Sequence, residues 1–450
     1  MNRKSFAIWT LGCKVNQFES EAIEKSLCQK GLKACDPGLS RKSRHSMEDG
    51  PDICIINTCT VTGKAAMQSR QAIRQAIRLH PGARIIVTGC YAQTRPEEIA
   101  AISGVDRIVG HGDKNRIPEL VFTCFPDPEK KPEIILSGNK GCWEKSFIDM
   151  PATPIGARTR PFLKIQDGCN AFCSYCIVPY ARGRSRSMPE NLVIEKIREL
   201  KTQNRKEAVL TGIHLGAYGK DLEPEKSLPE LLLKICEHQL IDRLRLSSVE
   251  PRELSADIIE LAVRWQCLCR HFHVPLQSGD NDILKRMNRP YDRIFFRDLV
   301  LKIKKRLPDA AIGVDVLAGF PGESPEAFDN TYTLLENLPV SYLHVFPFSP
   351  REGTPACNFS DPVPSKLIKE RCRILRELSG RLRKKFYSGF IGKNIEVLVE
   401  EKRDPVTGLL KGISRNYIPV LFDGENEHKN SLINVKVRKV ESDNVVFGEI

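Results

Sequence analysis

Short apolar runs alternate with longer amphipathic segments through the first 123 residues. Residues 6–11, 53–57, 84–88 and 107–109 are apolar and rich in β-branched side chains, which is typical of buried strands. Between them, residues 64–80 carry apolar side chains at helical spacing. Strands that alternate with helices favour a parallel sheet, so residues 1–123 are predicted to form an open parallel α/β domain.

The alternation stops in residues 124–159, which are rich in proline and are predicted to be a linker. It resumes in residues 160–387, where the pattern predicts strands at 162–166, 208–211, 243–247, 271–275, 312–317 and 342–346. Helices are predicted between them at 189–203, 228–238, 255–265, 291–306 and 325–337. A closed barrel of this kind needs eight units, so this domain is predicted to be a partial (β/α)6 barrel.

In residues 388–450 the apolar positions recur at every second residue. Strands are predicted at 395–399, 417–422, 432–440 and 445–447. Several short strands in so small a segment indicate a small β-barrel at the end of the chain.

Composition narrows the class of protein. The chain has 450 residues, 41% of them hydrophobic and 28% charged, as in globular proteins. No apolar run approaches the roughly 18 residues of a membrane span, and the first residues do not resemble a secretion signal. We therefore expect a cytoplasmic protein without a membrane partner, whose 16 cysteines are available for metal binding, catalysis or burial rather than for disulfides.

Three cysteines lie together directly after a predicted strand, in Gly168-Cys169-Asn170-Ala171-Phe172-Cys173-Ser174-Tyr175-Cys176. A four-iron cluster normally takes four thiolate ligands, so three thiolates would leave one iron open to a small molecule. A zinc site is the alternative, because C-x2-C is also a zinc spacing. Zinc would require a fourth ligand nearby, and residues 177–182 supply none.

Three further cysteines, Cys13, Cys59 and Cys90, each follow a predicted strand of the first domain. The carboxyl ends of parallel strands share one edge of a sheet, so these thiols could converge although they are far apart in the chain. Gly12 and Gly89 beside them would allow a bulky cofactor to approach the backbone. Three separately buried cysteines remain the alternative.

Polar and glycine positions recur at the strand ends of the second domain. Glycines lie in residues 210–216 and 313–323, and the polar residues Ser247, Glu250 and Gln277 follow other predicted strands. Barrels of this type bind their ligands at the carboxyl ends of the strands. The pattern therefore predicts a ligand site at the same rim as the cysteine loop.

Together these motifs resemble the methylthiotransferases of the radical S-adenosylmethionine superfamily, along essentially the whole chain. The resemblance rests on the surroundings of the six cysteines, including the tail at 177–187, and on Pro275-Leu276-Gln277-Ser278-Gly279, Gly319-Phe320-Pro321-Gly322-Glu323 and Phe346-Pro347-Phe348-Ser349-Pro350. It implies an N-terminal methylthiotransferase domain, a radical S-adenosylmethionine barrel and a C-terminal TRAM domain at residues 388–450.

The resemblance also implies two [4Fe-4S] clusters and S-adenosylmethionine as cofactors. One cluster would be held by Cys169, Cys173 and Cys176 and would bind S-adenosylmethionine through its open iron. The auxiliary cluster would be held by Cys13, Cys59 and Cys90 and would carry the sulfur to be inserted. By position, the candidates for holding S-adenosylmethionine are Tyr175, Gly212, Ser247, Glu250 and Gln277. Beyond the cluster cysteines, no catalytic residue is predicted.

Members of this family act on isopentenyladenosine in tRNA, on threonylcarbamoyladenosine in tRNA, or on an aspartate of a ribosomal protein. Residues 10–17, Thr-Leu-Gly-Cys-Lys-Val-Asn-Gln, resemble the threonylcarbamoyladenosine branch. The expected partners are tRNA, modified next to the anticodon, and an electron donor such as flavodoxin or ferredoxin, with the enzyme acting as a monomer. A non-catalytic RNA-binding module that carries zinc or a cluster is the alternative from a different class.

The charge distribution agrees with a polyanionic partner. The formal net charge is +13, and two stretches are strongly basic. Residues 64–84 contain five Lys/Arg and no acid, and residues 365–386 contain nine Lys/Arg against two Glu. Residues 393–450 are close to neutral, with nine Lys/Arg against ten Asp/Glu. We therefore expect the two basic stretches to carry much of the phosphate contact.

Reversing the charge of Arg381, Arg383, Lys384 and Lys385 together is predicted to weaken tRNA binding, because fewer counterions would be released from the phosphates. The change is measured as tRNA affinity over a series of salt concentrations. Unchanged affinity at low salt would contradict the prediction.

Overall fold

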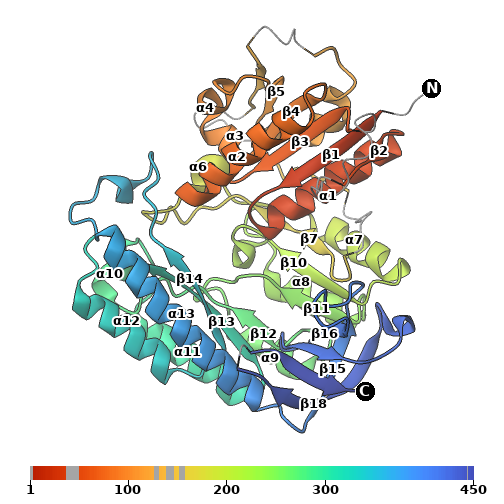
Figure 1. The fold of residues 1–450 in the computed structure, drawn as a ribbon. Helices are drawn as coiled ribbons and strands as arrows, with labels where there is room; N and C mark the ends of the chain where they lie inside the picture. The colour runs from red at the N-terminus through yellow and green to blue at the C-terminus, as the bar shows by residue number, and fades with distance from the viewer. Residues whose placement is uncertain (1–3, 37–49, 126–130, 138–145, 152–157, 443) are drawn as a thin grey trace.

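The computed structural model describes residues 4–36, 50–125, 131–137, 146–151, 158–442 and 444–450. Figure 1 shows three parts: an N-terminal sheet with its helices at the top, a curved central layer of strands and helices, and a small barrel beside the C-terminus. None of the described helices is long and apolar enough to cross a bilayer.

The N-terminal sheet has six parallel strands, in agreement with the predicted open α/β domain. In spatial order they are β2 (Lys33–Ala34), β1 (Ser5–Thr10), β3 (Ile53–Thr58), β4 (Arg84–Gly89), β5 (Arg107–Val109) and β6 (Glu133–Ile135). Within residues 124–159, predicted to be a linker, the structure describes β6, which pairs with β5; residues 126–130, 138–145 and 152–157 of that stretch lie outside the described residues. Three residues on an edge are too few for a periodic signal among prolines.

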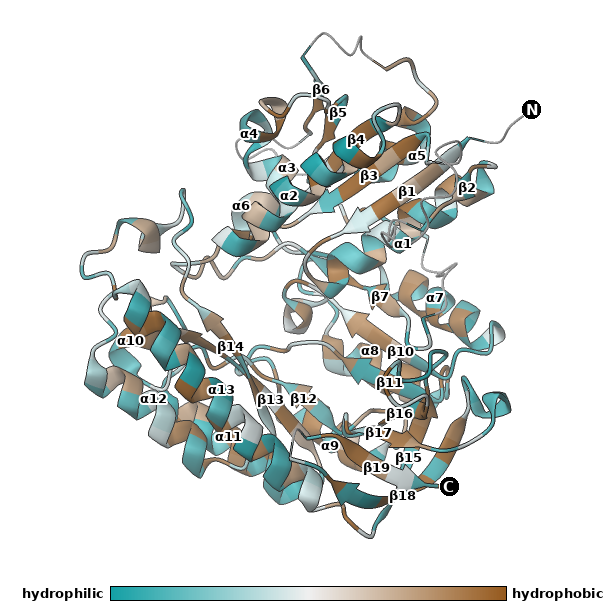
Figure 2. Cartoon of the chain, in the orientation of Figure 1, coloured by the Kyte–Doolittle hydropathy of each residue, from teal (hydrophilic) through white to brown (hydrophobic). Residues whose placement is uncertain are grey.

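Alternating side chains of this sheet pack against helices on its two faces. Ile53 and Ile55 belong to the same core as α1 (Lys14–Gln29) and α5 (Ile117–Leu120). Cys54 and Ile56 belong to the core under α2 (Gly63–Leu79), with α3 (Cys90–Thr94) and α4 (Pro96–Ala100) nearby. Burial on both faces explains the continuous apolar runs of the strands, which are brown in Figure 2.

The central part consists of two parallel three-stranded sheets that continue one another. The first contains β7 (Phe162–Lys164), β10 (Glu207–Thr211) and β11 (Arg243–Leu246), and the second contains β12 (His271–His273), β13 (Ala311–Ala318) and β14 (Tyr342–Pro347). Parallel bridges from Leu244 to Leu268 and from Ser248 to His273 join them. All six predicted strands are present, and the arrangement is the predicted partial barrel.

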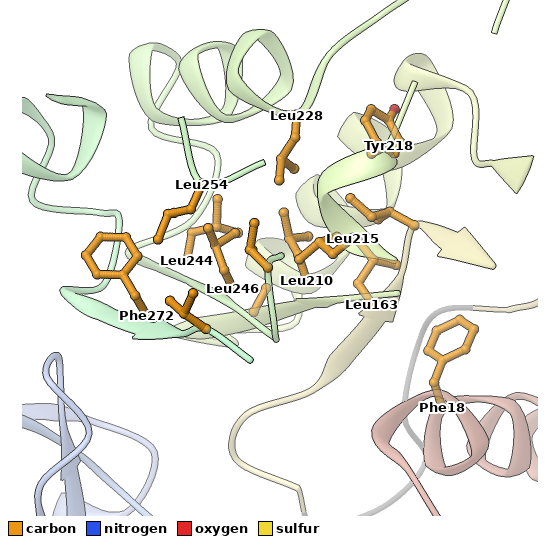
Figure 3. Close-up of a cluster of buried hydrophobic side chains, with 14 of the residues drawn as sticks. Phe18, Leu163, Leu210, Leu215, Tyr218, Leu228, Leu244, Leu246, Leu254 and Phe272 are labelled. Carbon is orange, nitrogen blue, oxygen red and sulfur yellow. The ribbon is translucent and has the colours of Figure 1, made fainter. Parts of the chain in front are cut away.

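Helices cover the outer face of this partial barrel. They are α7 (Glu190–Thr202), α8 (Leu228–Glu237), α9 (Ala256–Arg264), α11 (Arg293–Arg306) and α12 (Pro325–Asn337), as predicted, together with α10 (Asn281–Arg286) and α13 (Ser365–Ser388). Leu210, Leu246 and Phe272 project from the strands into the apolar layer under these helices (Figure 3). Because side chains alternate along a strand, Arg245 and His273 project to the opposite side, into the barrel. The lumen is therefore polar.

Residues near the C-terminus form a closed barrel of five strands, where the sequence predicted four. The strands are β15 (Asn394–Val399), β16 (Leu410–Ser414), β17 (Pro419–Phe422), β19 (Val446–Glu449) and β18 (Leu432–Val440). The missed strand is β16, where Lys411 and Gly412 interrupt the apolar alternation. Gly412 is required there, since a Cβ atom would lie 2.5 Å from a methyl group of Val397.

The small barrel is docked against the base of the central one by buried arginines. Arg245 donates to the carbonyl oxygens of Ser414 and Arg415 at 3.0 and 3.1 Å, and Arg243 donates to that of Ile413 at 3.1 Å. Both guanidinium groups also pair with the buried Glu207. Tyr417 stacks on His271 with ring centroids 4.4 Å apart. The C-terminal barrel thus lies against the base of the lumen.

Candidate active site

The three N-terminal cysteines meet at the carboxyl edge of the sheet. Cys13 caps α1, Cys59 follows β3, and Cys90 begins α3 directly after β4. Burial raises the pKa of the Cys59 thiol to about 12, and Cys90 and Cys13 raise it further because their sulfurs lie nearby. Cys59 and Cys90 are buried and Cys13 is exposed. The three thiols thus lie near one another at this edge of the sheet.

Two glycines make this convergence possible. A Cβ atom on Gly12 would lie 2.9 Å from the Cys59 sulfur, so a side chain there would occupy the space between the thiols. Gly89 adopts a φ of +101°, and its Cα lies against the backbone of Thr58. Both positions require a residue without a side chain.

The second cysteine group occupies the loop after β8 (Gln166–Asp167). Gly168 begins the loop at a φ of +72°, with the Arg184 carbonyl where a side chain would be. Burial raises the pKa of Cys176 to about 12, and Cys173 and Cys169 raise it further, so the three sulfurs are neighbours. The loop ends in α6 (Val178–Arg182), which packs against α3.

Basic side chains contact two sulfurs of this loop. His214 Nδ1 lies 3.3 Å from the Cys169 sulfur, and Arg289 donates to the Cys173 sulfur at 3.1 Å. Burial lowers the pKa of His214, but hydrogen bonds with Cys169 and Glu253 outweigh it and raise the pKa to about 10. Positive charge beside a thiol favours its thiolate form, which is the form that binds metal.

Tyr175 belongs to this loop, Glu250 is linked to it through Arg289, and Ser247 follows the neighbouring strand β11. Glu250 forms an ion pair with the same Arg289 that contacts Cys173, and burial nevertheless raises the pKa of Glu250. Burial also raises the pKa of Tyr175; the nearby Arg289 opposes this shift, and Cys173 and Glu250 add to it. The Ser247 hydroxyl is buried without a hydrogen-bond partner among the described residues.

The other two predicted positions lie on the same rim but without direct contact to the cysteines. Gly212 follows β10, and a Cβ atom there would lie 2.8 Å from the Gln166 side-chain oxygen. Gln277 adopts a φ of +70° and forms a parallel bridge with Val316 of β13. No hydrogen bond or ion pair of the described residues joins Gln277 to Tyr175, Glu250 or the cysteine loop.

A buried network of charges lies between the two cysteine groups. Arg182, the last residue of α6, donates to Asn16 at 2.5 Å, to Asp167 at 2.9 Å and to Glu19 at 3.0 Å. Lys164 donates to Glu19 at 3.1 Å and to Asp167 at 3.2 Å. Asn16 and Glu19 come from α1, which begins beside Cys13.

Two further residues from the 3-10 turn His111–Arg116 complete this network. Lys114 pairs with Glu19, and His111 Nε2 lies 3.0 Å from Asp167. Burial and the nearby Arg182 lower the pKa of His111 to about 4, so its ring is neutral at neutral pH. The network, which joins the N-terminal sheet to the barrel, therefore holds three cations against two carboxylates.

The donor sets fit four-iron clusters better than single metal ions. Zinc with four thiolates at about 2.3 Å would require sulfurs about 3.8 Å apart. Among the described residues, neither cysteine group brings its three sulfurs within 4.8 Å of one another. In a cluster the thiolates bind different irons and lie farther apart. The buried Ser247 hydroxyl at the end of β11 has no hydrogen-bond partner among the described residues and is free to bind a polar ligand.

Arg289, His214 and Arg182 were not predicted as site residues. His214 lies within the glycine-containing stretch 210–216, and Arg182 lies within the tail of the cysteine loop. Both are therefore part of segments that the sequence analysis had singled out. Arg289 follows α10 and carries no sequence signal. Its contact with Cys173 exists only because the turn after α10 folds back over the loop.

A partial barrel of six strands with three cysteines after its first strand is characteristic of radical S-adenosylmethionine enzymes. Residues 163–335 match the family model described as "Radical SAM superfamily", and residues 5–110 match "Uncharacterized protein family UPF0004". The solved structure of the radical S-adenosylmethionine methyltransferase TsrM from Kitasatospora setae shares the fold. It has a TM-score of 0.59 and 15% identity and covers 84% of this chain and 85% of that chain.

The threonylcarbamoyladenosine tRNA methylthiotransferase MtaB of Bacillus subtilis is 40% identical, over 96% of this chain and 93% of the relative. A tRNA-2-methylthio-N(6)-dimethylallyladenosine synthase of Clostridium botulinum is 34% identical, over 99% and 97%. The chain belongs to the radical S-adenosylmethionine methylthiotransferase family. Its members use S-adenosylmethionine and [4Fe-4S] clusters, as the resemblance implied.

Replacing Arg182 by Met should lower the free energy of unfolding by about 3–5 kcal/mol, because Glu19 and Asp167 would lose a buried partner. Urea denaturation measures the change. Arg184→Met, an exposed position in the same tail, is the matched control and should change stability little. Equal stability of the two variants would contradict the role given to the network.

Proposed function

We propose that this enzyme adds a methylthio group to threonylcarbamoyladenosine in tRNA, next to the anticodon. One observation carries the proposal: two groups of three free cysteines lie at the carboxyl ends of two sheets and are joined by one buried charge network. Sulfur insertion at an unreactive carbon requires a radical source and a sulfur source side by side. The substrate assignment is supported by the relatives with the higher identity.

The proposed ligands of the radical cluster are Cys169, Cys173 and Cys176, and those of the auxiliary cluster are Cys13, Cys59 and Cys90. When bound, the two clusters and S-adenosylmethionine supply the radical, the sulfur and the methyl group. Tyr175, Gly212, Ser247, Glu250 and Gln277 remain the proposed contacts of S-adenosylmethionine.

The protein's own contribution is to orient and to shield the cofactors. Arg289 bridges Cys173 and Glu250, so it fixes the cysteine loop relative to the strand end after β11. His214, cationic at neutral pH, donates toward Cys169 while Glu253 holds its other ring nitrogen at 2.9 Å. Such hydrogen bonds to cluster ligands tune reduction potential.

Fewer basic residues of α13 are available to contact tRNA than the sequence implied. On α13, Arg371 is buried against Glu323, and Arg373 pairs with Glu370 and Glu377. Five other cations of the helix are exposed and have no carboxylate partner among the described residues: Lys366, Lys369, Arg376, Lys384 and Lys385. These are the proposed phosphate contacts. We further propose that the enzyme acts as a cytoplasmic monomer with flavodoxin or ferredoxin as electron donor.

Substituting one cysteine of each group should separate the two proposed clusters. After anaerobic reconstitution, the wild type should hold about eight irons per chain. Cys59→Ala should lower bound iron to about half and retain cleavage of S-adenosylmethionine, whereas Cys173→Ala should lower it similarly and abolish cleavage. Cys54→Ala, which changes a buried cysteine of β3, the strand just before Cys59, is the control and should keep the full iron content. Bound zinc without cleavage would refute the cluster assignment.

Nucleoside mass spectrometry of tRNA tests the substrate. In cells that lack this protein, threonylcarbamoyladenosine should lose its methylthio group, and the wild-type chain should restore it while the Cys173→Ala chain should not. Loss of the methylthio group from dimethylallyladenosine instead would favour the second candidate function, that of the Clostridium botulinum relative.

A further inference from the structure

A cavity of about 220 Å³ lies where the N-terminal sheet, the central barrel and the C-terminal barrel meet. Its walls include Lys14 of α1, Val209 and Arg245 of the barrel strands, and Tyr417 of the small barrel. The lining is predominantly cationic: Lys14, Arg158, Arg160, Arg245 and Lys402 face two carboxylates, Glu400 and Glu401. A cavity with this excess of positive charge suits an anionic ligand.

The arginines of this cavity already have partners. Arg245 is held by Glu207 at 2.7 Å, Arg160 by Glu400 at 2.9 Å, and Arg158 by Glu21 at 2.8 Å. The Nε atom of Arg160 is the exception: it is buried and has no acceptor among the described residues. An unpaired buried donor is costly unless a ligand or water accepts its hydrogen bond.

Among the described residues, Lys14 and Lys402 line this cavity without an ion-pair partner, and of the two only Lys14 is partly buried. Its side chain is partly buried and lines the cavity, yet no carboxylate or other acceptor of the described residues lies within bonding distance of its ammonium group. Arg245 and Arg160 line the same cavity as Lys14. An incoming anion would relieve the repulsion among these three cations.

The position of Lys14 places the cavity next to the proposed auxiliary cluster. Lys14 directly follows Cys13, one of the proposed ligands of the auxiliary cluster. A substrate whose reacting carbon faces that cluster can therefore place a substituent of the same base beside Lys14. The threonylcarbamoyl group ends in a carboxylate, while the dimethylallyl group is apolar.

We propose that Lys14 and Arg160 form a subsite for the carboxylate of the threonylcarbamoyl group, and that this subsite selects the substrate. The inference rests on the proposed function and deepens it. A carboxylate accepts charge-assisted hydrogen bonds from both side chains. An apolar substituent would leave Lys14 and the buried Nε donor of Arg160 without an acceptor, so the enzyme would reject it.

The test compares the affinity of the reconstituted holoenzyme for two anticodon stem-loops, one with threonylcarbamoyladenosine and one with adenosine at the same position. Fluorescence anisotropy at fixed salt measures both. The wild type should prefer the modified stem-loop, and Lys14→Met should reduce that preference about ten- to one-hundredfold. Lys14→Arg should retain most of it. Because the readout is a ratio, phosphate contacts common to both ligands cancel.

Lys33→Met, which removes an exposed lysine from β2, is the matched control and should leave the preference unchanged. Arg160→Gln is an independent variant away from the cluster cysteines and should also reduce it. Bound iron is measured for each variant, because Lys14 directly follows a proposed cluster ligand. If Lys14→Met holds less iron than the wild type, the subsite is judged from the preference of Arg160→Gln alone.

The outcomes separate the subsite from the proposed function. A wild type without any preference would refute the substrate assignment itself. A wild-type preference that survives in Lys14→Met with full iron content, or in Arg160→Gln, would overturn the subsite and leave the proposed function standing.

Discussion

The buried charge network around Arg182 and Glu19 constrains the rest of the structure. Removing five ionised groups from water is expensive, and only close pairing offsets that cost. Asn16 and Glu19 belong to the N-terminal sheet domain, whereas Lys164, Asp167 and Arg182 belong to the barrel. The network is therefore complete only when the two parts are docked in this one orientation. The same docking brings Cys13 and Cys90 close enough to Arg182 to interact electrostatically with its guanidinium group.

The charge imbalance of this network has a chemical consequence. With His111 neutral, three cations face two carboxylates, and the excess positive charge of Arg182 lies beside the N-terminal cysteines. Thiolates bound to iron carry negative charge, so a cluster at this place would compensate the excess positive charge of the network. The second group has its own cations in Arg289 and His214. In both sites the cations oppose the effect of burial, which raises the pKa of the thiols. Both sites lie at the carboxyl ends of parallel strands, where such folds bind their ligands.

The elements that the sequence predicted well are the long periodic ones. All six barrel strands and the five helices between them were predicted within a few residues, because each buries one apolar face in a continuous core. The errors lie in short segments: β6 has three residues on an edge, and β16 contains Gly412 where its neighbours leave no room for a side chain. Among the basic residues of α13, the sequence did not distinguish the buried Arg371 from the exposed Lys384, because the partner Glu323 is distant in the chain.

By itself the sequence determined which atoms can do the chemistry. Local spacing places Cys169, Cys173 and Cys176 in one loop, and a buried apolar run before each of Cys13, Cys59 and Cys90 places them at strand ends. Only the tertiary structure decided that these two groups are joined, that Arg289 contacts Cys173, and that Lys14 enters a cavity shared with the C-terminal barrel. The physical reason is that charge pairing and burial act through space: partners more than a hundred residues apart leave no periodic trace in the chain.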